Sequence, residues 1–157
     1  MWESRTATVP RRLLVILRVY LGTLFIYAGV TKLNDGQWPS ELVGFLQGAL
    51  QHGHPFYRGF ISGVVLPHAA GFAAVIRMAE LLTGVALVTG TATRLAALGA
   101  MFLTVNYMFA KGAWWWWASS NDSAFFFIAL VLILGRAGRS FGVDYFLAQR
   151  WPDAWIW

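Results

Sequence analysis

Three ionisable side chains fall inside long apolar stretches of the sequence, where a charge is costly to keep. They are Arg18, Arg77 and Glu80. A charged group at the centre of a bilayer costs about 2.5–3.5 kcal/mol on insertion scales, so each needs a charged partner or a polar cavity. Arg77 and Glu80 are spaced i, i+3, which places them on one helix face, and Asn106 falls at a similar depth in a later stretch. We therefore predict an intramembrane polar cluster of Arg18, Arg77, Glu80 and Asn106.

This cluster has two interpretations. In the first, Glu80 is the central partner of both arginines, and the cluster is a clamp that fixes helix pairing. In the second, the same groups line a pocket for a polar head group, such as a quinone carbonyl or an anion. The sequence leans toward the clamp, because the charges can satisfy one another.

The first apolar stretch carries a seam of residues spaced by four, three, four and three, which is the period of a packed helix face. The seam consists of Arg18, Gly22, Phe25, Gly29 and Lys32. Its two glycines could admit a neighbouring helix or the flat ring of a ligand. Possible ligand-binding residues are therefore Gly22, Gly29 and Lys32, with hydroxyl donors from Tyr27 and Tyr107.

The histidine and cysteine content limits which metal cofactors the chain is able to bind. The sequence has no cysteine, which excludes disulfides, thiolate catalysis and Cys-ligated zinc or iron–sulfur clusters. His52 and His54 lie in a Gly-Pro loop without a nearby third ligand, so we predict no metal site. His68 begins the second apolar stretch and could ligate a haem or a chlorophyll magnesium. A bis-His haem is excluded because no second helical histidine is present.

Composition indicates a bilayer as the solvent. Hydrophobic residues make up 58% of the 157 residues, against about 45–50% in an ordinary soluble domain, and charged residues make up 12%, about half the usual share. A chain of this size cannot bury so much apolar surface in its own core. The net charge of +5 comes from dispersed residues rather than from a basic stripe, which argues against nucleic acid as a partner.

The apolar stretches predict an all-α fold, an integral membrane four-helix bundle in a single domain over residues 1–157. Each predicted span is close to the length needed to cross a hydrocarbon core about 30 Å thick. The spans are 13–33, 68–90, 94–110 and 123–139. Between the first two, residues 40–66 predict an extra interfacial or re-entrant helical segment.

Tryptophan and basic residues predict how the bundle sits in the membrane. Trp prefers the interface, so we expect anchors at Trp114, Trp115, Trp116, Trp117, Trp151, Trp155 and Trp157. With the N-terminus inside, the inner side holds Arg5, Arg11, Arg12, Arg94, Arg136, Arg139 and Arg150, and the outer side holds Lys32, Arg58 and Lys111. This excess of inner basic residues predicts that both termini are cytoplasmic, in the bacterial inner membrane.

Three ordered motifs resemble the DoxX family. The first is the seam from Arg18 to Lys32, followed by Leu33. The second is Glu80-Leu81-Leu82-x-Gly84, followed by Gly90-x3-Arg94-Leu95-Ala96-Ala97. The third is the closing run from Gly135 to Asp144. The likeness covers roughly residues 13–146.

The resemblance implies a small four-helix membrane protein, with Arg18, Lys32, Glu80 and Arg94 as family positions of unassigned role. Some relatives belong to thiosulfate:quinone oxidoreductases and others to membrane-associated redox complexes. We therefore expect an accessory membrane subunit of a larger respiratory or photosynthetic redox complex, without chemistry of its own. The alternative is a quinone-linked oxidoreductase subunit, and the third possibility is a small-solute carrier. Expected partners are the lipid bilayer and other membrane subunits, and expected ligands are a quinone, a lipid or a pigment.

Overall fold

The computed structural model describes residues 11–116 and 120–156, and within these ranges the chain is helical and has no strand. The expectation of an all-α protein is therefore confirmed. In chain order the segments are α1 (Arg11–Asn34), α2 (Trp38–His52), α3 (Pro55–Phe60), the π-helical η1 (Ile61–Val65), the 3-10 helix η2 (Leu66–His68), α4 (Ala69–Thr89), α5 (Thr93–Lys111), α6 (Asp122–Leu134), the 3-10 helix η3 (Ala137–Arg139) and α7 (Val143–Arg150).

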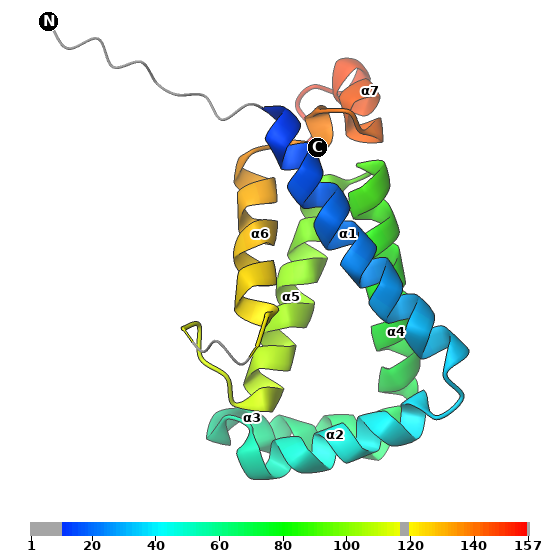
Figure 1. The fold of residues 1–157 in the computed structure, drawn as a ribbon, viewed down its shortest axis with the longest axis vertical. Coiled ribbons are helices and arrows are strands. Elements are labelled where there is room, and N and C mark those ends of the chain that lie inside the picture. The colour runs from blue at the N-terminus through cyan, green and yellow to red at the C-terminus, as the bar shows by residue number, and fades with distance from the viewer. Residues whose placement is uncertain (1–10, 117–119, 157) are drawn as a thin grey trace, which may run out of the picture.

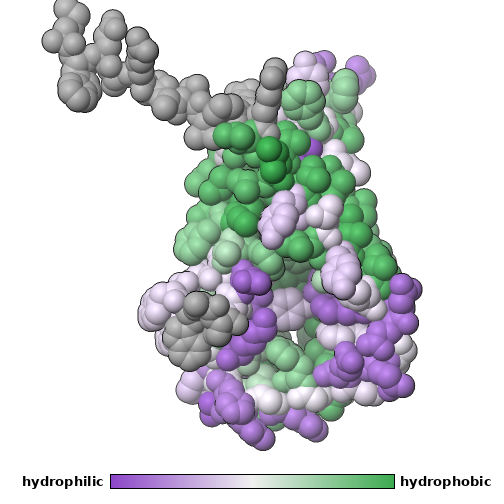
Figure 2. Space-filling model, in the orientation of Figure 1, coloured by the Kyte–Doolittle hydropathy of each residue, from purple (hydrophilic) through white to green (hydrophobic). Residues whose placement is uncertain are grey.

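Four long helices lie side by side, with α1 packed against α4 and α6, and α5 packed against the same two (Figure 1). Their shared core contains the fully buried Leu21, Leu87, Ala97 and Leu132. Two stretches, Leu13–Asn34 and Pro55–Thr89, are long and apolar enough to cross a membrane. Large apolar side chains also cover much of the outer surface, which Figure 2 shows as a hydrophobic upper half.

Glycines bring α1 and α4 into close contact. A Cβ added to Gly84 would lie 2.6 Å from the backbone nitrogen of Ile26, and one added to Gly22 would lie 2.9 Å from the carbonyl oxygen of Gly84. Gly29 is equally tight, because its Cβ would lie 2.9 Å from the nitrogen of Leu81. The seam is therefore filled by α4. No room remains beside Gly22 or Gly29 for the flat ring of a ligand, so that part of the ligand-site prediction is corrected.

The segment between α1 and α4 closes one end of the molecule. In Figure 1, α2 and α3 lie across the lower end of the long helices rather than alongside them. A second core joins this layer to α4, through buried residues that include Leu42, Leu46, Ile61 and Ala73. The indole nitrogen of Trp38, at the start of α2, also donates to the carbonyl oxygen of Ala73 at 3.0 Å.

The bounds of α1, α4 and α5 agree with three of the predicted ranges, whereas α6 differs from the fourth. The span expected over 123–139 ends as an α-helix at Leu134. The next residue is Gly135, where an added Cβ would lie 2.5 Å from a methyl carbon of Leu14. Arg136 then takes a left-handed conformation with φ 49°. The chain turns there into η3 and α7, which lie at the same end as the start of α1 (Figure 1).

Candidate functional site

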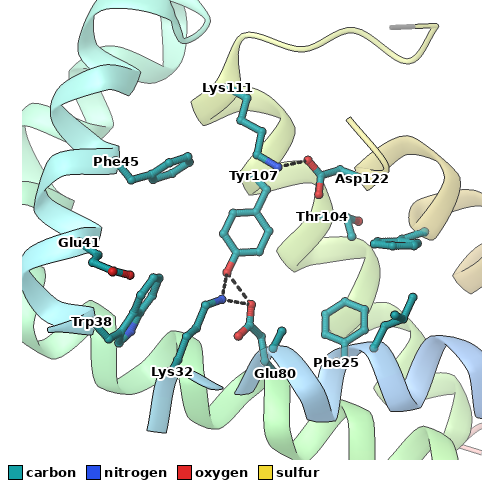
Figure 3. A pocket seen from close by; sticks show the side chains of 13 residues that line it. Phe25, Lys32, Trp38, Glu41, Phe45, Glu80, Thr104, Tyr107, Lys111 and Asp122 are labelled. Atoms are coloured by element: carbon teal, nitrogen blue, oxygen red, sulfur yellow. Dashed lines mark hydrogen bonds and ion pairs between the residues drawn. The ribbon is translucent and has the colours of Figure 1, made fainter. Parts of the chain in front are cut away.

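A pocket of about 410 Å³ opens in the lower half of the molecule, between the bundle and α2. Hydrophilic residues surround this hollow in Figure 2. Side chains from five helices line it (Figure 3). Its charged and polar members are Lys32, Glu41, Glu80, Thr104, Tyr107, Lys111 and Asp122, and its aromatic members are Phe25, Trp38, Phe45, Tyr107 and Phe125.

Three of these side chains meet at one point of the wall. Lys32 on α1 donates to Oε1 of Glu80 on α4 at 2.5 Å, and the hydroxyl of Tyr107 on α5 donates to the same oxygen at 2.6 Å. The Lys32 ammonium also lies 3.1 Å from the Tyr107 hydroxyl oxygen (Figure 3). Glu80 is only 2% exposed, so its charge is balanced by Lys32 rather than by water. We call these residues the Lys32–Glu80–Tyr107 cluster.

The cluster leaves hydrogen-bonding capacity unused. The second carboxylate oxygen of Glu80, Oε2, is buried and has no partner among the described residues. The Lys32 ammonium has three N–H groups, of which two are directed at Glu80 and Tyr107. It also lies 4.7 Å from the ring centroid of Trp38, a distance at which a cation is attracted to an indole face. This point of the wall therefore holds an unused donor and an unused acceptor.

A second ion pair lies farther along the pocket. Lys111 at the end of α5 donates to Asp122 at the start of α6 at 2.7 Å, and the Ser120 hydroxyl also donates to that carboxylate. The ring of Tyr107 lies between the ammonium groups of Lys32 and Lys111 in Figure 3. Its centroid is 5.3 Å from the Lys32 nitrogen and 5.7 Å from the Lys111 nitrogen. The sequence did not identify Trp38, Glu41, Lys111 and Asp122 as residues of the site, because residues of these types are common at the ends of membrane helices.

The predicted polar cluster is divided among different parts of the structure. Arg18 is 1% exposed and donates to the carbonyl oxygens of Ala137, Ser140 and Phe141 at 3.0, 3.1 and 2.9 Å. The hypothesis that Glu80 is the central partner of both arginines is therefore wrong. Arg77 is partly buried, does not line the pocket, and its Nε has no hydrogen-bond partner in the described part of the chain.

Asn106 lies apart from the Lys32–Glu80–Tyr107 cluster. It accepts a hydrogen bond from the hydroxyl of Tyr57 on α3 and donates to the carbonyl oxygen of Phe102 at 2.7 Å. Of the four residues expected to share one interior, Glu80 alone lines the pocket just described.

The remaining candidate ligand residues also separate. Lys32 and Tyr107 line the pocket, whereas Tyr27 is 71% exposed on the outer face of α1. His68 is exposed, and its Nδ1 lies 2.9 Å from the carbonyl oxygen of Val64, so its proposed role as a pigment or haem ligand stays a prediction. Across residues 11–116 and 120–156, no three His, Cys, Asp or Glu residues come together as a metal site would require.

The described tryptophans gather at the two ends of the molecule. Trp114 packs on His54, with ring centroids 4.6 Å apart, and stacks on Trp116 at 5.6 Å. Trp151 and Trp155 follow α7 and are about half exposed, and the carbonyl oxygen of Trp155 accepts a bond from Arg94 at 3.1 Å. Trp115 packs against Phe126 at 4.7 Å. Trp117 and Trp157 lie outside the described residues, and the anchoring role of the set stays a prediction.

These features define an all-helical protein with apolar helices and a charged pocket at one end, which indicates a membrane protein. The family model named DoxX matches residues 13–113, so the chain belongs to the DoxX family. The match runs from α1 to just beyond α5 and includes Lys32, Glu80 and Tyr107. No solved structure matches the chain.

Proposed function

We propose that the chain is a membrane subunit of a redox system and binds a quinone in the pocket of about 410 Å³. The observation that carries the proposal is the buried Lys32–Glu80–Tyr107 cluster beside aromatic walls. It combines a charged donor with a buried carboxylate oxygen that has no partner in the described part of the chain. The proposal includes four membrane crossings, by α1, α4, α5 and α6. It places both termini on the cytoplasmic side of a bacterial inner membrane.

The chemistry of the cluster suits both redox forms of such a ligand. The free N–H of Lys32 is able to donate to a quinone carbonyl oxygen, and its positive charge stabilises negative charge that develops there on reduction. Oε2 of Glu80 is able to accept a hydrogen bond from a quinol hydroxyl. The rings of Trp38 and Phe45 supply apolar surface for the flat face of the ligand.

The proposal assigns the source of the electrons to another component. Since the chain contains no cysteine, it cannot hold a thiolate-ligated iron–sulfur cluster or exchange electrons through a dithiol. The proposal therefore places the chain in a larger respiratory or photosynthetic complex, in which a partner subunit delivers or removes electrons.

Calorimetric titration tests the proposal. Purified protein in a mild detergent is titrated with a ring-only benzoquinone, and we expect saturable binding. Tyr107→Phe removes one hydroxyl and Lys32→Gln removes the ammonium, and each should weaken binding at least tenfold, about 1.4 kcal/mol. Tyr27→Phe makes the same chemical change on the exposed face of α1 and should leave affinity unaltered.

Two results would overturn the proposal. The first is the absence of saturable binding by the wild-type protein. The second is an equal loss of affinity in Tyr107→Phe and Tyr27→Phe, because a site defined by the cluster cannot depend on a hydroxyl outside it. Each variant is first shown to elute like the wild type and to remain folded at the temperature of the titration.

A second candidate function is an accessory subunit that contributes surface alone. The observation that favours it is the aromatic end formed around α7, where Phe141, Phe146 and Trp151 are 76%, 69% and 53% exposed. Gentle detergent extraction followed by mass spectrometry tests this role. A chain that migrates as a monomer with no co-purifying protein would contradict it.

A further inference from the structure

A second pocket, of about 230 Å³, lies between α4 and α5 and is covered by α2 and η1. Its walls are almost entirely apolar and include Leu46, Phe60, Val65, Phe72, Ile76 and Phe102. Two of its few polar side chains, Tyr57 and Asn106, satisfy each other through a hydrogen bond. A cavity with this lining accepts a hydrocarbon group and offers little to a polar one.

The two pockets share a wall. Phe45 and Tyr107 line both, and their rings pack edge to face with centroids 6.5 Å apart. The Tyr107 hydroxyl is held by its hydrogen bonds to Lys32 and Glu80, whereas the Phe45 ring has no polar group to hold it. Phe45 is therefore the less constrained of the two rings that line both pockets.

The second pocket also reaches the apolar outer surface. Val75 on α4 and Phe102 on α5 line it and are 64% and 69% exposed. Exposed large apolar side chains on a membrane helix face the lipid, so the gap between these helices is open to the hydrocarbon core. A polar site, a ring pair and a lipid-facing apolar cavity thus follow one another across the molecule.

We infer that the ligand of the polar pocket is a quinone with an isoprenoid tail, that the tail occupies the second pocket, and that the ligand enters laterally between α4 and α5. This inference rests on the proposed quinone site and adds the tail and the route. The tail passes from the hydrocarbon core into an apolar cavity, where van der Waals contacts with the cavity walls stabilise it, and the head group then reaches Lys32 past Phe45.

Charge distinguishes this occupant from a phospholipid, whose acyl chain could also fill the cavity. The polar pocket contains two cationic groups, from Lys32 and Lys111, and three carboxyl groups, from Glu41, Glu80 and Asp122. Its formal charge is therefore −1 when all five are ionised. Both cations are already paired with carboxylates, so the pocket holds no unpaired positive charge for a phosphate group, whereas a neutral quinone ring needs none.

The first test compares two quinones that share one head group, one ring-only and one with a short isoprenoid tail. Calorimetry in one detergent gives, for each protein, the ratio of the affinities of the two quinones. The tail partitions into micelles to the same extent in every experiment, so this effect cancels when the ratios of two proteins are compared. We expect the tail to strengthen binding at least tenfold in the wild type. Ala79→Phe fills the second pocket and should cut this gain below threefold while leaving ring-only affinity unchanged.

The matched control is Ala70→Phe, an equal increase in volume at an exposed position of α4 outside both pockets. It should keep the full gain from the tail. An Ala79→Phe protein with the wild-type ratio would overturn the inference. If the ring-only quinone binds with the expected dependence on Tyr107, the proposed function survives that result.

Photolabelling provides a measurement that needs no variant. A quinone with a diazirine at the end of its tail is bound to the wild-type protein, irradiated and located by mass spectrometry. We expect label within residues 72–83 and 99–110, removed by excess tailed quinone and retained in excess phospholipid. Label on α1 or α6, or label displaced by phospholipid, would overturn the inference.

Discussion

At the scale of single residues, the most consequential arrangement is a buried carboxylate with two donors on one oxygen. Glu80 depends on Lys32 for charge balance and on Tyr107 for a second hydrogen bond. Such a group is stable only while its partners remain, because a buried charge without a partner pays its full desolvation cost. The ion pair is therefore expected to act as a unit in stability as well as in binding.

Replacement of Lys32 by methionine tests this coupling. Lys32→Met leaves the Glu80 carboxylate buried without a cation and should lower the free energy of unfolding by about 3 kcal/mol. The double variant Lys32→Met/Glu80→Leu removes both charges and should recover part of that loss, although the Tyr107 hydroxyl then lacks its acceptor. SDS-driven unfolding in mixed micelles measures both. A double variant no more stable than Lys32→Met would mean that the loss does not come from the unpaired Glu80 charge.

At the scale of helices, the glycine contact between α1 and α4 sets how closely these elements approach. Gly84 meets the backbone of α1, whereas Gly71, at the other end of α4, has no atom within 4 Å of the position a Cβ would take. Replacing glycine by alanine should therefore change stability in opposite directions at these two positions of α4, because α1 fills the space beside Gly84 and the space beside Gly71 is open.

Gly84→Ala forces the helices apart and should cost about 1–3 kcal/mol of stability. Gly71→Ala stiffens the helix in open space and should add about 0.5–1 kcal/mol. Unfolding of the two variants under one set of conditions gives both values. A Gly84→Ala protein as stable as Gly71→Ala would show that α1 and α4 do not touch there.

A second element-scale contact joins α7 to the start of α5. Asp144 is fully buried and accepts hydrogen bonds from the backbone nitrogens of Ala92 and Thr93 at 2.6 and 2.8 Å. A carboxylate at a helix N-terminus satisfies unpaired N–H groups and interacts favourably with the helix dipole. Asp144→Ala should therefore lower stability by about 2 kcal/mol. Asp153→Ala, at an exposed position, serves as the control and should melt like the wild type.

At the scale of the whole molecule, the two ends differ. One end holds the start of α1 with α7, and at the other end α2 and α3 lie across the long helices (Figure 1). The pocket lies near that second end, against α2. Under the proposed topology the first end is cytoplasmic, and the pocket lies toward the outer side of the membrane. This direction decides which side of the membrane a soluble partner approaches.

Thiol labelling tests that direction, and the absence of cysteine makes the background clean. Gln37→Cys lies at the start of α2 and Gln149→Cys lies in α7, both at exposed positions. In intact spheroplasts, a membrane-impermeant maleimide should label the first variant and spare the second until the membrane is opened. The reverse pattern would invert the topology, and labelling of both would place the two ends on one side.

The sequence by itself determined the helices. Long apolar stretches cannot stay in water, and in lipid they must satisfy their own backbone groups, so α1, α4 and α5 begin and end within about two residues of the predicted spans. The extra helical segment predicted between the first two spans is also helical in the structure. The predicted end of α6 was too late, because the helix already stops at Leu134, where the apolar run gives way to Gly135 and a left-handed Arg136.

Only the tertiary structure decided which polar groups meet. Depth along a helix predicts how far a charge lies in the membrane, but its partner depends on which helices are neighbours and how each is rotated. Arg18 is paired with carbonyl oxygens that the turn after α6 exposes, so it is not available to Glu80. Glu80 instead meets Lys32, 48 residues away in sequence, because the glycine seam draws α1 against α4 and a long side chain reaches in from the helix end.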